Sequence, residues 1–264
     1  MLPPQAGLRE YVLMDLKYEQ TGSLAIVYDA DQVAQAGEHL FDPVYWQKNN
    51  AITRTASGRG NALMLATPFG PAVLRTYLRG GWAARLSHSR YIFTGFKHSR
   101  PVSELRVLAS LWSRGLPVPQ PLAAFCRRHG LTYSGALLTR CISNARTLAD
   151  QMEDLAPGHP GWFLVGACIR KFHDAGVIHP DLNARNILLC ERNGEVGQAF
   201  LVDFDRASLR LARKSDCKRN LDRLDRSLRK MWPVLNRDRL AECWAELIKG
   251  YNESRSTNRK NDLA

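Results

Sequence analysis

A segment in the second half of the chain carries the residue types that phosphoryl transfer requires. His179, Asp181 and Asn186 follow one another at short spacings, and a further carboxylate, Asp203, comes directly after an apolar pair. One carboxylate can stand beside an attacking hydroxyl group. An amide oxygen and a second carboxylate can hold Mg²⁺ against a triphosphate, because this hard cation prefers oxygen ligands. The spacing therefore predicts a phosphoryl-transfer site in which Asp181 orients the hydroxyl group or accepts its proton.

Regular elements must hold these residues in place, and local patterns predict them. Residues 161–173 are expected to form a helix, because apolar residues recur there at helical spacing. Short strands are expected at residues 187–189 and 199–202, on either side of an Asn193-Gly194 turn of the type that closes hairpins. The chemistry-bearing residues would then lie on a loop after a helix and at the end of a hairpin.

The first half of the chain is expected to be rich in strands, and the last part helical. Strands are predicted at residues 23–28, 63–65, 72–78, 122–126 and 135–142. Helices are predicted at residues 31–39 and 103–114, the second with Ser103 as its N-cap. Two apolar stripes between residues 221 and 251 predict further helices.

The segment from His173 to Leu189 resembles the catalytic loop of the protein-kinase-like fold, and Asp203-Phe204-Asp205 resembles its D-F-G motif. Over roughly residues 57–230 the chain is similar to the Kdo (3-deoxy-D-manno-octulosonic acid) kinases, relatives of the heptose kinases of the lipopolysaccharide core. The motifs that carry this resemblance are Gly58-Arg-Gly60, Leu74-Arg-Thr-Tyr, Arg79-Gly-Gly81, Gly115-Leu-Pro-Val-Pro-x-Pro121, His173-x-x-Gly-Val-x-His-x-Asp-Leu-Asn-x-x-Asn-Ile-Leu-Leu189, Asp203-Phe-Asp205 and Leu224-Asp-Arg-Ser-Leu-Arg-Lys230.

The resemblance implies a bilobal α+β protein-kinase-like fold. Residues 1–142 would form a strand-rich lobe with one helix, and residues 143–264 a short helical lobe that carries the catalytic loop and the metal motif. ATP and Mg²⁺ would bind between the lobes, with Asn186 and Asp203 as the metal ligands. Asn183 would orient Asp181 or the transferred phosphate, and His179 would pack beneath the loop as a structural residue.

Upstream residues fall where such a fold binds the nucleotide. Gly58 and Gly60 would let the backbone approach the phosphates, although two glycines also suit an ordinary turn. Arg75 stands in register with the strand lysine of kinases and would neutralise the phosphates, but it also suits an exposed strand. Glu104 would pair with Arg75, although a helix dipole alone favours a glutamate there. Finally, Cys141 and Ile142 fall near the hinge that holds adenine through its backbone.

Departures from the kinase pattern bear on the acceptor. Pro180 replaces the arginine that reads a phosphorylated activation loop, and Asp205 replaces the glycine of D-F-G. Only 59 residues follow Asp205, and they contain no A-P-E motif. A small-molecule or glycolipid acceptor is therefore favoured over a protein. The family resemblance implies transfer from ATP to the 4-hydroxyl of Kdo on a lipid A precursor, at the cytoplasmic face of the inner membrane.

Charge supports an anionic partner. The chain carries 37 Lys and Arg against 25 Asp and Glu, a net charge of +12. This charge is concentrated in the segments 75–100 and 206–230. An acidic membrane, a phosphorylated substrate and nucleic acid would all be attracted, and a merely solvated surface is the alternative. A nucleic acid is not expected, because the sequence holds no recognition motif and no interleaving of aromatic and basic residues.

Other features bear on location and on rival functions. Six isolated cysteines without a C-x-x-C pair fit a reducing compartment, no secretory leader is recognised, and no apolar run is long enough to span a bilayer. We therefore expect peripheral membrane contact at most. A heptose kinase on the same scaffold remains an alternative. So does a nucleotide-binding pseudokinase or membrane adaptor, while a protein kinase is disfavoured by the short helical lobe.

Overall fold

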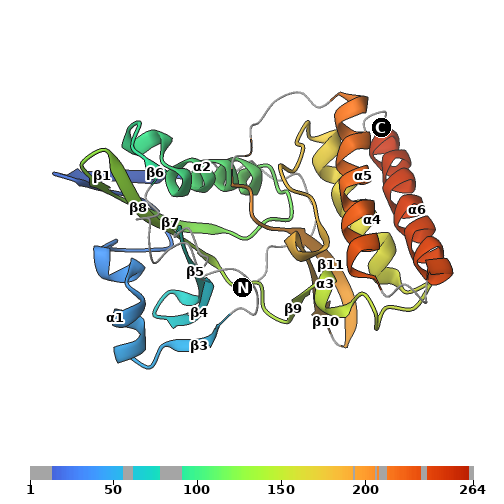
Figure 1. Cartoon of the computed structure of the whole chain (residues 1–264), viewed down its shortest axis with the longest axis horizontal. Coiled ribbons are helices and arrows are strands. Elements are labelled where there is room, and N and C mark those ends of the chain that lie inside the picture. The colour runs from blue at the N-terminus through green and yellow to red at the C-terminus, as the bar shows by residue number, and fades with distance from the viewer. Residues whose placement is uncertain are drawn as a thin grey trace. The chain divides into compact units, whose positions relative to one another are not determined.

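The computed structural model describes residues 14–55, 62–77, 91–192, 194–205, 207, 213–232 and 237–261 (Figure 1). These residues form two compact units. The first comprises the described residues up to Leu116 together with Gln120–Cys141, and the second comprises Pro117–Pro119 and the chain from Ile142 onward. The short Pro117–Pro119 segment belongs to the second unit because the carbonyl of Pro117 accepts a hydrogen bond from the backbone N–H of Leu201 at 3.0 Å.

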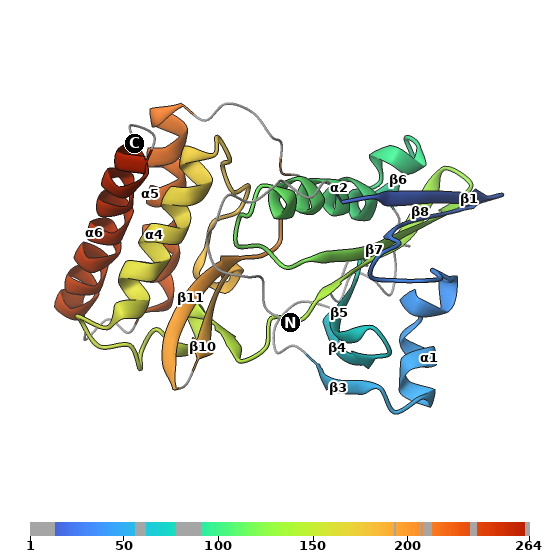
Figure 2. The same ribbon diagram turned by 180° about the vertical axis from the view of Figure 1, so that it is seen from behind.

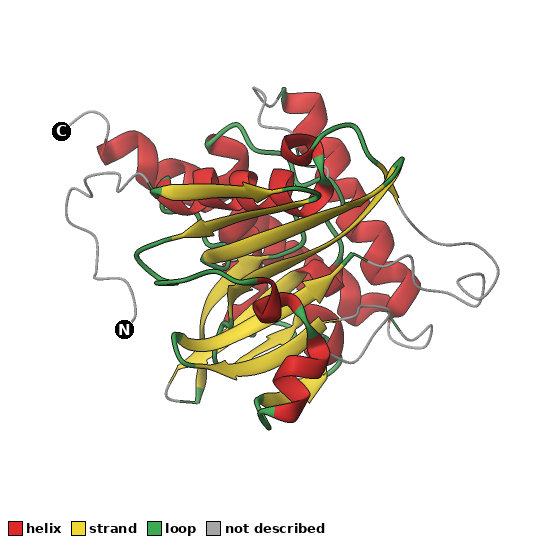
Figure 3. Cartoon of the chain, turned by 90° about the vertical axis from the view of Figure 1, so that its left-hand side faces the viewer, coloured by secondary structure: helices red, strands yellow, loops and turns green. Residues whose placement is uncertain are grey.

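An antiparallel sheet of eight strands forms the frame of the first unit (Figures 1 and 3). Seven strands follow the order β1-β2-β7-β8-β5-β4-β3, and β6 pairs with β8. The strands are β1 (Leu16–Thr21), β2 (Leu24–Asp29), β3 (Ile52–Thr55), β4 (Ala62–Thr67), β5 (Gly70–Thr76), β6 (Tyr91–Ile92), β7 (Pro121–His129) and β8 (Thr132–Arg140). Helix α2 (Arg100–Ser113) packs on β7 and β8.

Apolar residues on alternate strand positions build the core of this unit. Ile26 and Tyr28 of β2 join a buried cluster with Phe41 and Trp46, which come from the 3₁₀ helix η1 (Glu38–Phe41) and helix α1 (Pro43–Lys48). The indole N–H of Trp46 donates to the carbonyl of Leu40 at 2.8 Å, so this buried donor has a hydrogen-bond partner. Because side chains alternate across a strand, Val27, which lies between Ile26 and Tyr28, faces the other side of the sheet.

Two sequence-based predictions for this unit are wrong. Residues 31–39 do not form a helix, because Asp29 turns the chain first: its carboxylate accepts from the backbone N–H of Asp31 at 3.1 Å, and its carbonyl accepts from that of Val33 at 2.9 Å. Helix α2 begins at Arg100, so Ser99 and not Ser103 holds the N-cap position. A proline in the second helical position, Pro101, is tolerated in a first turn.

The second unit combines long helices with a small antiparallel sheet, seen from behind in Figure 2. Its helices are α3 (Leu148–Gln151), α4 (Pro160–Asp174), α5 (Lys214–Met231) and α6 (Arg237–Asn261), and its sheet has the order β11-β10-β9 with β9 (Ala145–Thr147), β10 (Ile187–Arg192) and β11 (Glu195–Leu201). The predicted α+β architecture is therefore confirmed. A strand-rich unit with a packed helix precedes a unit in which a helix, a His-x-Asp loop and a hairpin follow in the protein-kinase-like order.

Among the described helices, none is both long and apolar enough to cross a membrane.

Helices α4 and α6 approach so closely that glycine is required at two points. A Cβ atom on Gly166 of α4 would lie 1.8 Å from the carbonyl oxygen of Leu247, and one on Gly250 of α6 would lie 2.1 Å from that of Phe163. Both obstacles are backbone atoms, which cannot turn aside as a side chain can. The missing side chains therefore set the spacing of the two helices.

Replacing Gly166 by alanine is expected to destabilise the protein by about 1–3 kcal/mol, because the helices must move apart and lose packing. In an exposed helix the same change would stabilise by up to about 1 kcal/mol, so the sign of the effect is diagnostic. Urea unfolding measures it. The control is Gly197→Ala, where the three atoms nearest to an added Cβ are side-chain atoms of Arg192 at 3.5 Å or more. Equal stabilities of both variants and the wild type would contradict the close contact.

Candidate active site

The loop that carries the candidate catalytic residues begins where α4 is closed by a glycine. Gly176 has a φ of +75°, a conformation that side chains disfavour. The N–H of Gly176 donates to the carbonyl of His173 at 3.0 Å, and the N–H of Val177 donates to that of Phe172 at 2.8 Å. This pair of bonds is a Schellman motif, which ends the helix and turns the chain sharply. The His173-x-x-Gly-Val pattern thus fixes where the loop starts.

His179 anchors the loop from below. Its ring is buried, and its Nδ1 accepts from the backbone N–H of Asp181 at 3.1 Å. The opposite nitrogen, Nε2, lies 2.9 Å from the carbonyl oxygen of Val202 and must donate to it, so the ring is the neutral Nε2–H tautomer. Burial lowers the pKa of His179, and the Val202 carbonyl and nearby carboxylates oppose that shift without reversing it. The predicted structural position of His179 beneath the loop matches this geometry.

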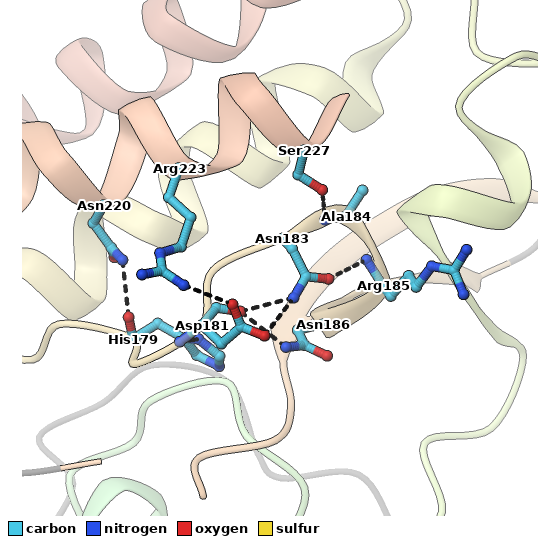
Figure 4. Close-up of polar contacts among 9 residues, drawn as sticks. All are labelled: His179, Asp181, Asn183, Ala184, Arg185, Asn186, Asn220, Arg223 and Ser227. Carbon is cyan, nitrogen blue, oxygen red and sulfur yellow. Dashed lines mark hydrogen bonds and ion pairs between the residues drawn. The ribbon is translucent and has the colours of Figure 1, made fainter. Parts of the chain in front are cut away.

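Asp181 projects from the loop into solvent, with 62% of its side chain exposed. Its Oδ2 accepts from the amide Nδ2 of Asn183 at 3.1 Å, and its Oδ1 lies 2.9 Å from Nη1 of Arg223 (Figure 4). Its backbone carbonyl accepts from the amide groups of Asn183 at 3.0 Å and Asn186 at 2.9 Å. The carboxylate is thus held in one orientation while it stays accessible to a substrate.

The two asparagines of the loop take distinct positions. Asn183 caps the 3₁₀ helix η4 (Ala184–Asn186), because its Oδ1 accepts from the backbone N–H of Arg185 at 2.9 Å. Since the amide nitrogen of Asn186 donates to the Asp181 carbonyl, its amide oxygen must point the other way (Figure 4). An amide fixed in this manner presents an oxygen of the kind that Mg²⁺ prefers.

Asp203 comes next to Asn186 through a direct backbone link. The N–H of Val202 donates to the carbonyl of Asn186 at 3.0 Å. The backbone of Asp203, the next residue, therefore begins close to Asn186. Asp203 is exposed and has a φ of +66°, in the left-handed region that non-glycine residues rarely occupy. Phe204 is fully buried and holds the segment down, with its ring 4.6 Å from that of His179 and 5.7 Å from that of Phe172.

The donor set at this point fits Mg²⁺. Asn186 and Asp203 offer an amide oxygen and a carboxylate, two hard oxygen groups on backbone segments joined by a hydrogen bond, and these residues would hold the cation. Magnesium sites in nucleotide-binding proteins commonly use one or two protein carboxylates, with water and phosphate oxygens as the other ligands. The described residues hold no cluster of three or more His, Cys, Asp or Glu that could bind a metal without such help.

Helix α5 supports the loop with residues for which the sequence predicted no role. The amide nitrogen of Asn220 donates to the carbonyl of His179 at 2.8 Å, and the hydroxyl of Ser227 accepts from the N–H of Ala184 at 3.3 Å (Figure 4). Arg223 lies between them. Their i, i+3, i+7 spacing puts all three on one helix face, which is a signal that the sequence contains.

A second buried histidine extends this support to the last helix. His173 Nε2 donates to Oδ1 of Asn220 over 3.1 Å, because an amide oxygen can only accept, and Nδ1 therefore accepts from the hydroxyl of Tyr251 over 2.8 Å. Burial lowers the pKa of His173 and raises that of Tyr251 to about 12. Helices α4, α5 and α6 thus meet in one polar chain that ends at the carbonyl of His179.

The first unit brings together two of the predicted nucleotide-binding residues. Arg75 of β5 forms an ion pair with Glu104 of α2, and Glu104 is buried. The hydroxyl of Tyr77, a residue for which the sequence predicted no role, bonds to the same glutamate and lies 2.7 Å from Nη2 of Arg75. The guanidinium also lies 4.9 Å from the centre of the Tyr77 ring. Arg75 keeps 25% of its side chain exposed, so it can still reach a ligand.

The remaining predicted residues divide into two groups. Gly58 and Gly60 lie outside the described residues. Cys141 and Ile142 follow β8, where the two units of the chain divide. The backbone N–H of Cys141 donates to the carbonyl of Pro71 at 3.0 Å, and so continues the pairing of β8 with β5. Adenine binding at this point would have to use other backbone groups.

Comparison with known proteins gives consistent matches. The model of the lipopolysaccharide kinase (Kdo/WaaP) family matches residues 44–251. A 3-deoxy-D-manno-octulosonic acid kinase of Xanthomonas euvesicatoria pv. vesicatoria (strain 85-10) is 42% identical over 233 residues, which are 88% of this chain and 91% of that protein. One of the same name from Stenotrophomonas maltophilia (strain R551-3) is 43% identical over 234 residues, covering 89% and 92%. A solved structure of WaaP in complex with acyl carrier protein has a TM-score of 0.45 and 16% identity, over 83% of this chain and 95% of that one.

The two buried histidines should make stability depend on pH in a defined window. Both pKa values lie below the ordinary value of 6.5, so below pH 6.5 the unfolded chain takes up protons that the folded chain refuses. Stability is therefore complete above pH 6.5 and falls below it, by up to about 1.4 kcal/mol per histidine and pH unit. Urea unfolding at pH 7.5 and 5.5 measures the loss. His173→Gln should reduce the difference between the two pH values, and an unchanged difference would contradict a neutral His173.

Proposed function

Because the chain belongs to the lipopolysaccharide kinase (Kdo/WaaP) family, it is a phosphotransferase that acts on a hydroxyl group, and we propose that its acceptor is Kdo. The phosphoryl group would go from ATP to the 4-hydroxyl of Kdo on a lipid A precursor, in the synthesis of the lipopolysaccharide core. The observation that carries this proposal is that relatives at 42% and 43% identity over most of the chain are named 3-deoxy-D-manno-octulosonic acid kinases.

Asp181 is the residue that we assign to the acceptor hydroxyl. As the hydroxyl oxygen attacks the γ-phosphorus of ATP, Asp181 takes up its proton, the new P–O bond forms, and the bond to the β-phosphate oxygen breaks with its electron pair leaving on ADP. The exposed carboxylate and its fixation by Asn183 support this role. Asn183 is then a positioning residue that limits the rotation of the carboxylate.

Asn186 and Asp203 would hold Mg²⁺ through an amide oxygen and a carboxylate oxygen. The cation supplies charge neutralisation for the triphosphate when it is bound. The hydrogen bond from Asn186 to the Asp181 carbonyl ties the proposed metal ligand to the proposed base. A displacement of Asn186 would therefore also displace Asp181. Such coupling suits a reaction in which catalysis depends mainly on positioning.

The phosphates of ATP would meet Arg75. Buried Glu104 and the hydroxyl of Tyr77 hold its guanidinium. Arginine offers five N–H donors in a rigid planar fork, a geometry that suits phosphate oxygens. The glycines at positions 58 and 60 would let the backbone approach the same phosphates, and the backbone at Cys141 and Ile142 would hold the adenine.

We also propose peripheral attachment to the cytoplasmic face of the inner membrane. The proposed acceptor is a glycolipid, and the net charge of +12 favours an anionic leaflet. Binding to vesicles with and without anionic lipid tests the attachment, since a charge-driven contact weakens as salt is added.

Replacing Asp181 by asparagine should abolish phosphoryl transfer with little effect on folding. The variant keeps the side-chain size but cannot accept a proton, so we expect the rate to fall by at least about 10²–10⁴-fold. Mass spectrometry of a Kdo-bearing lipid A precursor after incubation with Mg-ATP measures the product. Asp222→Asn serves as the control, because this carboxylate pairs with Lys218 on the outer side of α5.

The same assay separates the rival functions. Transfer only to a heptose-bearing core would replace the acceptor, while ATP binding without transfer to any acceptor would indicate a pseudokinase. Near wild-type activity of Asp181→Asn would overturn the assignment of the base.

Replacing Glu104 by glutamine should raise the KM for ATP by about tenfold, because Arg75 loses its charged partner. The KM for the acceptor should change far less. Tyr77→Phe keeps the ion pair and removes only the hydroxyl, so its effect on the KM for ATP should be smaller. Initial rates at varied ATP concentrations measure both variants. Equal changes in the two KM values for Glu104→Gln would count against a role at the phosphates.

A further inference from the structure

The proposed catalytic carboxylate has a cationic partner on another element. Nη1 of Arg223, on α5, lies 2.9 Å from Oδ1 of Asp181, and half of the arginine side chain is exposed. Only one guanidinium nitrogen and one carboxylate oxygen take part in this contact. An ion pair of this exposed kind contributes little to stability, so the arginine can exchange its partner for a better one at little cost.

The pairing distinguishes Arg223 from the other basic residues of its helix. Three of them pair with acids on α5 itself: Lys218 with Asp222, Arg219 with Asp216, and Arg229 with Asp225. Such pairs stabilise a helix and keep its surface soluble. Arg223 reaches instead to the catalytic loop (Figure 4). The contact of Arg223 with the loop is therefore not explained by stabilisation of the helix.

The backbone on both sides of Arg223 is fixed against the loop. One turn before it, Asn220 donates to the carbonyl of His179 at 2.8 Å, and one turn after it, Ser227 accepts from the N–H of Ala184. The helix cannot slide past the loop without breaking these bonds. The guanidinium can thus move by rotation of the arginine side chain, while the backbone of Arg223 stays at a constant distance from Asp181.

We propose that Arg223 binds the carboxylate of the acceptor sugar acid. This inference rests on the proposed function, since the relatives are named for an acceptor that is an acid. In the absence of acceptor, Arg223 holds Oδ1 of Asp181. When the acceptor arrives, the guanidinium turns to the acceptor carboxylate, to which it can bind through two parallel N–H···O bonds. Oδ1 is then released for the hydroxyl group that is to be phosphorylated.

This exchange gives the site a means of choosing its acceptor. A sugar without a negative charge at this place would leave Arg223 on Asp181 and compete poorly for the carboxylate oxygen. A carboxylate and a phosphate would both satisfy a guanidinium. The lipid A part of the acceptor is the second source of anionic groups, so the experiment must separate the two.

The test combines variants of the full-length protein with modified acceptors in non-ionic detergent. Arg223→Gln and Arg223→Lys are assayed with the Kdo-bearing lipid A precursor, with the same lipid after conversion of the Kdo carboxylate to an amide, and with a precursor that lacks its lipid A phosphates. Values of kcat/KM for the acceptor and the KM for ATP are measured for each. Arg226→Gln removes one positive charge from the same helix and is the matched control, and urea unfolding checks that the variants fold.

For Arg223→Gln we expect kcat/KM on the carboxylate acceptor to fall by about 10- to 100-fold, the range of a charge-assisted hydrogen bond, with the KM for ATP within about twofold of wild type. The amide acceptor should lower the wild-type value by a similar factor and the Arg223→Gln value hardly at all, because the two changes remove one interaction. Arg223→Lys should recover part of the activity, and Arg226→Gln should leave the preference for carboxylate over amide unchanged.

Several results would overturn the inference. Additive losses from Arg223→Gln and the amide would show that the guanidinium and the carboxylate do not meet. Coupling to the lipid A phosphates in place of the carboxylate would assign Arg223 to the other anion. An equal effect of Arg226→Gln would reduce the role to general charge. If the wild-type protein phosphorylates no Kdo-bearing acceptor, the proposed function fails and the inference with it, whereas the other results leave that function intact.

Discussion

The neutral, buried ring of His179 is the element on which the geometry of the second unit depends. One ring nitrogen accepts from the N–H of Asp181 and the other donates to the carbonyl of Val202. The ring thereby joins the loop that carries the proposed base to the segment that leads to Asp203. A protonated ring would have to donate at both nitrogens, and the bond to the Asp181 N–H would be lost. Burial, which lowers the pKa of His179, protects this arrangement.

Much of the surrounding structure keeps that ring in place. Phe204 packs against one face of the site, and Asn220 holds the carbonyl of His179 itself. The chain of polar contacts then continues through His173 to Tyr251, so that three helices share the task. In phosphoryl transfer the protein contributes little covalent chemistry and acts mainly by positioning the reacting groups accurately. A hydrogen-bond network of this kind provides such positioning.

The sequence predicted the parts of the site that depend on local order. The Asp181, Asn186 and Asp203 pattern lies on a loop and at a hairpin end as expected, and Arg75 does meet Glu104. No role was predicted for Arg223 or Tyr77, because each meets its partner, Asp181 or Glu104, only through the tertiary fold. Strand β1 was missed for another reason: most of it is exposed, so it lacks the apolar alternation that identifies a strand. The prediction at residues 31–39 was wrong because the side chain of Asp29 bonds to the backbone N–H of Asp31 and turns the chain. Hydrophobic periodicity does not reveal such a bond.

The backbone of Asp203 limits which residues the chain can accept there. At a φ of +66°, most side chains crowd the following carbonyl, whereas asparagine, aspartate and glycine tolerate the conformation. A replacement by alanine or valine would thus change the path of the main chain as well as the charge. Asparagine and glycine remove the negative charge and leave the turn as it is, and of the two only asparagine keeps a polar side chain there. Sequence drift at this position is therefore confined to a few residue types by the shape of the chain, even before any requirement of chemistry is considered.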